Sequence, residues 1–335
     1  MNQMHKNRGS LVTVTAALWV CVGLGSRGFC GLPQRLIVRE LPVRAVPAAP
    51  SLFRPVAIVC EKEEIYILDS GDADIKVFAA DGAFRRSLGK KGAAPGEFRL
   101  PGDMDVLGGR LYVADSANRR VQVLDSRGAY LEGFGLRAMP WRILALDDDR
   151  IAIVHLPSGP SGPDKLVTCY HRSGAPAWRE LDPVDSGDAV YDSWRNQVLL
   201  ARAPGGGLWL VRSFDDRVLR RLNRDGELTG VVAPPELELP FKDISVPTGQ
   251  GRNRTLRGFC RSCAAAGGRL FLLLPEYTED GDLGAGKTVA VIAPGGGVEG
   301  IINLPERMSR IAVQGDIIYA IDAGPRLRIL EMIRK

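Results

Sequence analysis

The sequence predicts an all-β fold, a six-bladed β-propeller of four-stranded antiparallel blades, from an internal repeat and from the strand that its last copy lacks. The repeat is clearest between residues 65–89 and 111–135, where Tyr66 aligns with Tyr112 and every match lies 46 positions along the chain. Short alternating apolar runs separated by turn residues at this period are typical of a propeller blade. One blade cannot bury both of its faces, so further copies are expected.

Weaker copies follow the first two. The third contains an insertion at 155–165, and in the fourth Trp209 takes the place of the repeated tyrosine. Tyr319 restores that tyrosine in the last copy. The four weaker copies lie at 151–174, 207–228, 267–297 and 316–332. Together with the first two copies they predict six blades.

The last copy reaches the end of the chain after three strands, which would leave an open sheet edge of unpaired backbone donors and acceptors. Residues 34–42 precede the first copy and have the alternating, β-branched character of a strand. We expect this segment to pair with residues 327–333 and to close the ring. Residues 35–335 are then a single propeller domain.

The N-terminus has the features of a secretory signal peptide. Basic residues precede an apolar run at 11–24 that ends in a small-x-small site, which predicts a signal peptide at 1–25 and a linker at 26–34. A lipoprotein anchor is disfavoured because bulky residues precede Cys21 and Cys30. The mature chain is therefore expected in the periplasm or outside the cell, with membrane attachment only through an uncleaved leader.

The charge balance is mild. The formal net charge is +5, and loss of Lys6 and Arg8 with the leader would lower it by two, to +3. Nucleic-acid binding is not expected, because the basic residues are dispersed and export removes the usual partner.

One stretch of the second copy resembles a known repeat. Residues 115–125 contain Asn118, Arg119 and Arg120 before an apolar strand, and residues 88–101 form the link to the preceding blade. Both closely resemble the NHL repeat. The resemblance implies a six-bladed propeller whose members mostly bind partners, with a minority of propeller relatives that are lactonases or lyases. Asn118, Arg119 and Arg120 are accordingly candidate binding residues.

Two residue types recur at fixed places in the clearest copies: Asp69, Asp115 and Asp322, and Tyr66, Tyr112 and Tyr319. Aspartate at a strand end accepts backbone hydrogen bonds in the following turn. The tyrosines have the bulk to bridge neighbouring blades. Both sets are therefore expected to be structural.

Residues 281–288 match the phosphate-loop pattern, with Gly281, Gly286, Lys287 and Thr288 at the required positions. That motif requires a following helix whose N-terminal amides face the phosphates. A short β-branched run follows instead, so we expect a strand and no nucleotide binding.

Cys260 and Cys263 leave two readings open, buried thiols or a disulfide in a bent loop; a catalytic dithiol is less expected. A zinc site would need a second cysteine pair, and haem attachment would need a histidine directly after Cys263; the sequence has neither. Calcium could bind the aspartate pairs at 72 and 74 and at 280 and 282, but solvated turns are the simpler reading. No cofactor or metal site is predicted.

The starts of the innermost strands carry the candidate binding residues Arg142, Arg261, Arg310 and Asp103. We expect Arg142 and Arg261 at equivalent positions and Arg310 one position along. Converging guanidiniums suit an anionic group such as a carboxylate. No catalytic residue is assigned, because the remaining histidines, at 155 and 171, fall at strand ends away from these starts.

The sequence thus favours a non-enzymatic exported propeller that recognises a protein, peptide or glycan through one loop-rich face. The loops concerned lie at 70–74, 116–120, 155–165, 213–217 and 276–287. The alternative is a hydrolase or lyase of the lactonase or amidating-lyase kind with a metal in the central channel. The ligand and the oligomeric state stay open.

Overall fold

The computed structural model describes residues 34–44, 50–156, 164–234, 243–276 and 284–333. Pro33–Lys335 form one compact unit, and this unit contains all of the described residues. The predicted signal peptide at 1–25 and nearly all of the linker at 26–34 lie outside them. In the part of the chain described, no helix combines the length and apolar character needed to cross a membrane.

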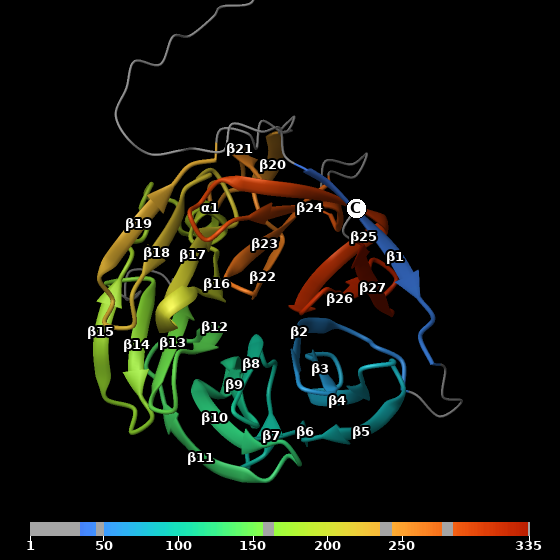
Figure 1. Ribbon diagram of the computed structural model, residues 1–335. Coiled ribbons are helices and arrows are strands. Elements are labelled where there is room, and N and C mark those ends of the chain that lie inside the picture. Colours follow the sequence, from blue (N-terminus) through green and yellow to red (C-terminus); the bar gives the residue numbers. More distant parts are fainter. Residues whose placement is uncertain (1–33, 45–49, 157–163, 235–242, 277–283, 334–335) are drawn as a thin grey trace, which may run out of the picture. The chain divides into compact units, whose positions relative to one another are not determined.

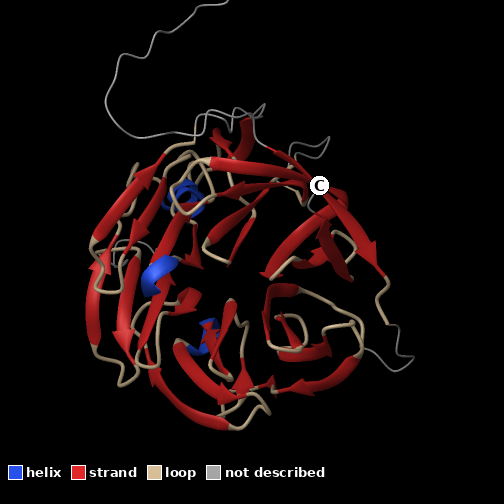
Figure 2. Cartoon of the chain, in the orientation of Figure 1, coloured by secondary structure: helices blue, strands red, loops and turns tan. Residues whose placement is uncertain are grey.

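The predicted six-bladed propeller is confirmed. Antiparallel sheets are arranged in a ring, and each blade runs outward from an innermost strand (Figure 1). The inner strands line a central channel. Strands account for most of the described residues and helices for few of them (Figure 2). The strands of blade 1 are β2 (Pro55–Glu61), β3 (Glu64–Asp69), β4 (Asp74–Ala79) and β5 (Phe84–Leu88). Those of blade 2 are β8 (Asp103–Leu107), β9 (Arg110–Asp115), β10 (Arg120–Asp125) and β11 (Tyr130–Gly135).

Blades 3 and 4 have the same order. Blade 3 consists of β12 (Pro140–Ala145), β13 (Arg150–His155), β14 (Val167–His171) and β15 (Pro176–Glu180). Blade 4 consists of β16 (Val198–Arg202), β17 (Leu208–Arg212), β18 (Leu219–Leu222) and β19 (Leu228–Val232).

Blades 5 and 6 are joined through one long strand, β25 (Val298–Gln314). Its first part is the outer strand of blade 5, and its second part is the inner strand of blade 6. The other strands of blade 5 are β22 (Ser262–Ala266), β23 (Arg269–Leu274) and β24 (Gly286–Ile292). Those of blade 6 are β26 (Ile317–Asp322), β27 (Leu327–Ile333) and β1 (Gln34–Leu41).

Ring closure by the N-terminal strand is confirmed. The second part of β1, from Ile37 to Leu41, pairs antiparallel with β27 and supplies the missing outer strand of blade 6. Its first part also pairs in parallel with β25, where Gln34 lies opposite Gly300. This second pairing was not predicted. It ties the N-terminal strand to blade 5 as well as to blade 6.

The repeated aromatic residues lie between blades, as expected. Tyr66 of blade 1 packs in one buried cluster with Val106 of blade 2, and Tyr112 of blade 2 packs with Ile143 of blade 3. Trp209 of blade 4 takes the same role against blade 5. The apolar core is therefore a series of interblade layers, although blade 3 has the small Ala152 at the corresponding position.

The repeated aspartates accept hydrogen bonds as predicted. Asp69 accepts the backbone N–H of Gly71 at 2.9 Å, and Asp322 accepts that of Gly324 at 2.8 Å. Asp115 differs in detail, because its backbone donor is Arg99 in the preceding interblade link, at 2.8 Å. Asp69 and Asp322 therefore fix the turn after the second strand of their blades, whereas Asp115 fixes the link that leads into blade 2.

Two insertions flank the channel between blades 3 and 5. Helix α1 (Ala189–Arg195) lies before blade 4, and the hairpin of β20 (Asp243–Pro247) and β21 (Asn253–Arg257) lies before blade 5. The Asp188 carboxylate joins them, since it accepts the N–H groups of Val190 and Tyr191 at the start of the helix and that of Gly249 in the hairpin. Smaller elements are β6 (Lys90–Lys91), β7 (Glu97–Phe98), a 3-10 turn at Ser116–Asn118 and another at Pro204–Gly206.

The segment that matches the phosphate-loop pattern runs into a strand, as predicted. Gly286, Lys287 and Thr288 are themselves part of β24, and Gly286 and Thr288 pair with neighbouring strands rather than starting a helix. Residues 281–283 lie outside the described part of the chain.

Candidate functional site

The innermost strands all start at one end of the channel. The pairing of each with the second strand of its blade shows which residues occupy equivalent positions there, and we call this set of residues a level. Each residue of this level lies opposite the next-to-last residue of the adjacent strand, as Asp103 does with Ala114, and Arg310 with Ile321. The six members are Ala57, Asp103, Arg142, Leu199, Ser262 and Arg310.

This register corrects the predicted alignment of the arginines. Arg142 and Arg310 are equivalent, and Arg261 lies one residue before the same level. The reason is a register shift at the start of β12, between Pro140 and Arg142, and another at the corresponding place in β25. Each such bulge adds a residue before the arginine and redirects the strand. The start of β22 has no bulge.

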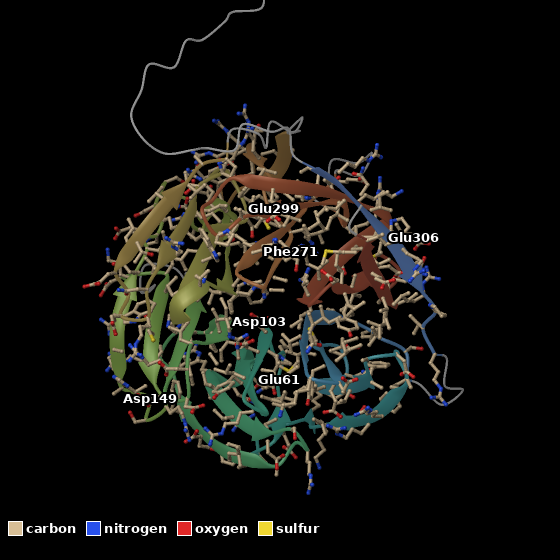
Figure 3. The ribbon with its side chains drawn as sticks, viewed as in Figure 1. Glu61, Asp103, Asp149, Phe271, Glu299 and Glu306 are labelled. Atoms are coloured by element: carbon tan, nitrogen blue, oxygen red, sulfur yellow. The ribbon has the colours of Figure 1, made fainter. Side chains whose placement is uncertain are left out.

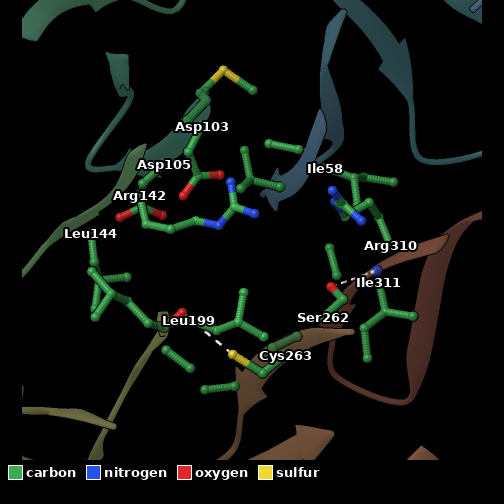
Figure 4. A pocket seen from close by; sticks show the side chains of 18 of the residues that line it. Ile58, Asp103, Asp105, Arg142, Leu144, Leu199, Ser262, Cys263, Arg310 and Ile311 are labelled. Atoms are coloured by element: carbon green, nitrogen blue, oxygen red, sulfur yellow. Dashed lines mark hydrogen bonds between the residues drawn. The ribbon is translucent and has the colours of Figure 1, made fainter. Parts of the chain in front are cut away.

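Arg142 and Arg310 reach into the channel from opposite sides (Figure 4). Arg142 donates from Nη1 to the carbonyl oxygen of Gly102 at 3.0 Å, and its guanidinium lies 4.8 Å from the ring centroid of Trp141. Arg310 donates from Nε to the carbonyl oxygen of Val56 at 2.8 Å and from Nη1 to that of Ser309 at 2.7 Å. Backbone carbonyls therefore fix both guanidiniums without neutralising them.

The three arginines are close enough to affect one another. Burial, together with the charges of Arg261 and Arg142, lowers the pKa of Arg310 to about 9. Burial and the charge of Arg142 also lower the pKa of Arg261. The buried Nε of Arg261 has no hydrogen-bond partner among the described residues. We call Arg142, Arg261 and Arg310 the arginine triad.

Asp103 is the carboxylate nearest to the triad. It lies beside the centre of the ring, whereas Asp149 and Glu306 lie toward its outer edge (Figure 3). Burial raises the pKa of Asp103 to about 6, although the charge of Arg142 and a hydrogen bond from the N–H of Ile143 act to lower it. One carboxylate cannot balance three guanidiniums, so this end of the channel, which we call the mouth, has an excess of positive charge.

Farther along the channel an ion pair crosses from blade 4 to blade 2. Arg202 donates from Nη2 to Oδ2 of Asp105 at 2.6 Å and to the carbonyl oxygen of Val106 at 2.9 Å. Oδ2 of Asp105 also accepts the N–H of Ala145 at 2.8 Å. The cavity between the inner strands has a volume of about 150 Å³.

A larger chamber lies over the arginine triad, with a volume of about 440 Å³. The insertions before blades 4 and 5 build one side of it. Trp194 of α1 packs edge-on against Phe214, with ring centroids 6.0 Å apart. The apolar wall consists of Trp141, Trp194, Phe214, Val246 and Pro247, and the polar lining includes Gln197, Ser213 and Ser245.

Asn118, Arg119 and Arg120 are placed elsewhere. Asn118 donates to Asp115 at 2.8 Å and to the carbonyl oxygen of Gly92 at 2.9 Å. Arg120 donates to the same carboxylate at 2.8 Å and also to two carbonyl oxygens of the interblade link. Arg119 is exposed in the left-handed backbone region. Asn118 and Arg120 therefore hold the link between blades, and none of the three lines the chamber.

The two cysteines are separate thiols. Cys260 donates to the carbonyl oxygen of Ser262, and Cys263 donates to that of Leu200 on blade 4. Burial raises the pKa of Cys263 to about 12 and that of Cys260 well above its usual value. Reactive cysteines need a stabilised thiolate, which these surroundings oppose. Of the two readings left open, buried thiols are the one that the structure has.

The aspartates considered for calcium already contact a cation of the protein. Asp72 and Asp74 accept hydrogen bonds from Nζ of Lys76 at 2.7 and 2.8 Å. The second pair, at 280 and 282, lies outside the described residues. Within the described ranges there is no group of three histidine, cysteine or acidic side chains placed to hold a metal ion.

Both histidines lie at strand ends, as predicted. His155 ends β13, where Nε2 lies 3.2 Å from the hydroxyl of Tyr170, and burial lowers its pKa to about 4. His171 ends β14 and contacts Asp149 at the outer edge. Neither lines the chamber over the triad.

Sequence reasoning missed the chamber wall and the crossing ion pair. The wall depends on the insertions before blades 4 and 5, which fall outside the repeat. A local signal did exist for the helix, because Asp188 is a typical N-cap residue. Arg202 was missed because its strand, the innermost of blade 4, does not match the sequence repeat that is clear in blades 1 and 2.

The comparisons with known proteins agree with the fold. A family described as 6-bladed beta-propeller matches residues 52–151. None of the curated proteins compared with the chain matches it. A solved structure of a candidate exported protein from Bacteroides fragilis NCTC 9343 is 12% identical with a TM-score of 0.59, over 90% of this chain and 95% of that one. Virginiamycin B lyase from Staphylococcus aureus is 12% identical with a TM-score of 0.53, over 89% and 100%. At such identities the likeness extends to the fold alone.

Proposed function

We propose that the chain is an exported, non-enzymatic propeller that recognises an anionic group on a protein, peptide or glycan partner at the channel mouth. The observation that carries this proposal is the arginine triad. Its members come from three different blades and face one chamber, with Asp103 as the adjacent carboxylate.

The physical reason is the cost of holding like charges together away from water. Removing a guanidinium from water is unfavourable unless hydrogen bonds and opposite charge compensate. For Arg142 and Arg310, hydrogen bonds to backbone carbonyl oxygens compensate part of the cost of removal from water. An anion in the chamber would supply the missing charge, and guanidinium groups suit a carboxylate because they donate in a planar fork.

The surrounding face suits a larger partner. Because neighbouring strands of a blade run in opposite directions, the loops between second and third strands lie at the same channel end as the starts of the inner strands. Helix α1 and the β20–β21 hairpin are further interblade links at that end. The triad would then be an anchor, with the loops providing the rest of the contact.

The alternative, a hydrolase or lyase with a metal in the channel, is less favoured by the charge of the mouth. Three guanidiniums repel a divalent cation as they attract an anion. The similarity in fold to virginiamycin B lyase does not change this preference. Elemental analysis of purified protein separates the two proposals, because stoichiometric metal whose removal abolishes an activity would support the alternative.

The test of anion recognition is thermal stabilisation by a simple carboxylate. Hexanoate should raise the melting temperature, and hexanamide, which has the same chain without the charge, should not, since only a ligand that binds the folded state stabilises it. Arg142→Gln with Arg261→Gln should abolish the hexanoate effect. The matched control is Arg127→Gln, because Arg127 is an exposed turn residue. Equal stabilisation of the double variant and the wild type would refute the site.

A further inference from the structure

The channel is narrower beneath the arginine triad than above it. Arg202 of blade 4 reaches Asp105 and the carbonyl oxygen of Val106 on blade 2, so an ion pair narrows the channel below the mouth. The space between the inner strands, about 150 Å³, is also smaller than the chamber above the triad, about 440 Å³. The chamber is therefore the roomier place for a ligand that enters from the mouth.

The chamber has different chemistry on its floor and on its wall. The floor is the arginine triad, and the wall carries aromatic side chains, with Trp194 and Phe214 packed edge to face. Apolar walls with a few oriented polar groups are usual in sites that fix a small group in one orientation. A ligand matching both surfaces carries a charge at its end and an apolar group next to it.

Two donors at this site are unused. The indole Nε1 of Trp141 and the Nε of Arg261 are buried and have no hydrogen-bond acceptor among the described residues. A buried donor without an acceptor is unfavourable. Both donors belong to residues that line the chamber, so a ligand oxygen that reached them after a small shift of either side chain would supply the missing acceptor.

From these three observations we propose that the ligand of the mouth is the terminal α-carboxylate of an apolar amino acid. This inference rests on the proposed function and makes it more specific. The carboxylate binds the arginine triad, the apolar side chain lies against Trp194 and Phe214, and the preceding residue extends out of the chamber toward the loops. Two sources share this chemistry, the C-terminus of a peptide and a free N-acyl amino acid.

The experiment is isothermal titration of the full mature chain with four probes. They are the peptide Gly-Ala-Phe with a free carboxylate, the same peptide with a C-terminal amide, Gly-Phe-Ala-Asp-amide with only a side-chain carboxylate, and N-acetylphenylalanine. The free peptide should bind at least about tenfold more tightly than either amide, because a hydrogen bond to a charged group contributes about 1.5–3 kcal/mol. Equal binding of free peptide and N-acetylphenylalanine supports the terminal group alone, whereas tighter peptide binding supports the C-terminus of a chain.

Variants separate this inference from the proposed function. Arg261→Gln should weaken the free peptide at least about tenfold, and Trp194→Ala should weaken Gly-Ala-Phe more than Gly-Ala-Ala. Arg127→Gln is again the control. If Gly-Phe-Ala-Asp-amide binds as tightly as the free peptide, the terminal carboxylate is wrong while anion recognition stands. If no probe binds and hexanoate gives no stabilisation, both proposals fail.

Discussion

The substitution Lys76→Met should destabilise the propeller through a buried charge cluster that the first blade builds around one amine. Nζ of Lys76 contacts Asp69 at 3.3 Å, Asp72 at 2.7 Å and Asp74 at 2.8 Å. The Lys76 side chain is 1% exposed and that of Asp69 is 0% exposed, so water cannot replace the amine at Asp69. Methionine keeps most of the volume and removes the charge.

The expected magnitude follows from burial. Removing one partner of a fully buried ion pair costs about 3–5 kcal/mol. Asp72 is 49% exposed and can be hydrated again, and Asp69 keeps backbone hydrogen bonds from Phe53 and Arg54. We therefore expect a loss near the lower limit, about 3 kcal/mol, and a fall in melting temperature of about 5 °C for a domain of this size.

The free energy of unfolding is measured by denaturant titration, and two further variants serve as controls. Lys90→Met removes an exposed ion pair with Glu97, which should change stability by less than about 1 kcal/mol. Lys76→Gln introduces the residue found at the equivalent position of blade 2, where Gln122 donates to Asp115 at 3.2 Å. It should therefore lose less stability than Lys76→Met. A loss for Lys76→Met no larger than that for Lys90→Met would refute the reasoning.

The same cluster predicts a pH dependence. Burial acts to raise the pKa of Asp69, but hydrogen bonds from the N–H groups of Arg54 and Phe53 and the charge of Lys76 hold it below its usual value. A lowered folded-state pKa gives stability that is present above the unfolded-state pKa and is lost as pH falls through the folded-state value. The difference between wild type and Lys76→Met should therefore shrink in acid.

Four further predictions concern the ring closure, the phosphate-loop match and the mouth. Deleting Gln34–Leu41 should destabilise the whole domain by at least about 5 kcal/mol, since it removes two strand pairings and half-buried side chains; an unchanged melting temperature would contradict the closure. Lys287→Ala should not alter nucleotide binding, and saturable ATP binding by the wild type that the substitution abolishes would show the strand reading to be wrong. Anion affinity should rise as pH falls through about 6, because protonated Asp103 no longer competes for the arginines. Asp103→Asn should flatten that profile, and an unchanged profile would remove Asp103 from the site. Asp103 itself should make the wild type less stable as pH rises from about 4 to 6, since its folded-state pKa is raised.

The fold was predictable because each blade repeats the same solution to the same packing problem. Alternation along short strands, aspartates at strand ends and an aromatic residue between blades are local signals with a period. The open edge after the last copy also predicted that β1 would close blade 6. The parallel contact of β1 with β25 carries no such signal, because it depends on how blades 5 and 6 share one strand.

The site was predictable only in part. The alignment of the repeats identified Arg142, Arg261, Arg310 and Asp103 as residues at inner-strand starts, but it misplaced the arginines relative to one another. A bulge adds one residue at a position that periodicity cannot fix. The chamber wall comes from α1 and the β20–β21 hairpin, which have no counterpart in the other blades. Asn118 and Arg120 were predicted as binding residues from their resemblance to a repeat, but in the structure both hold an interblade link.

The most direct test of anion recognition is a crystal structure of the protein grown in bromide, with the anion located by its anomalous scattering. The account predicts an ordered bromide within hydrogen-bond reach of the arginine triad in the wild type. It also predicts that this bromide disappears in Arg142→Gln with Arg261→Gln while other bromide sites remain. Bromide bound elsewhere on the wild type with none at the mouth, or a mouth site that persists in the double variant, would contradict it.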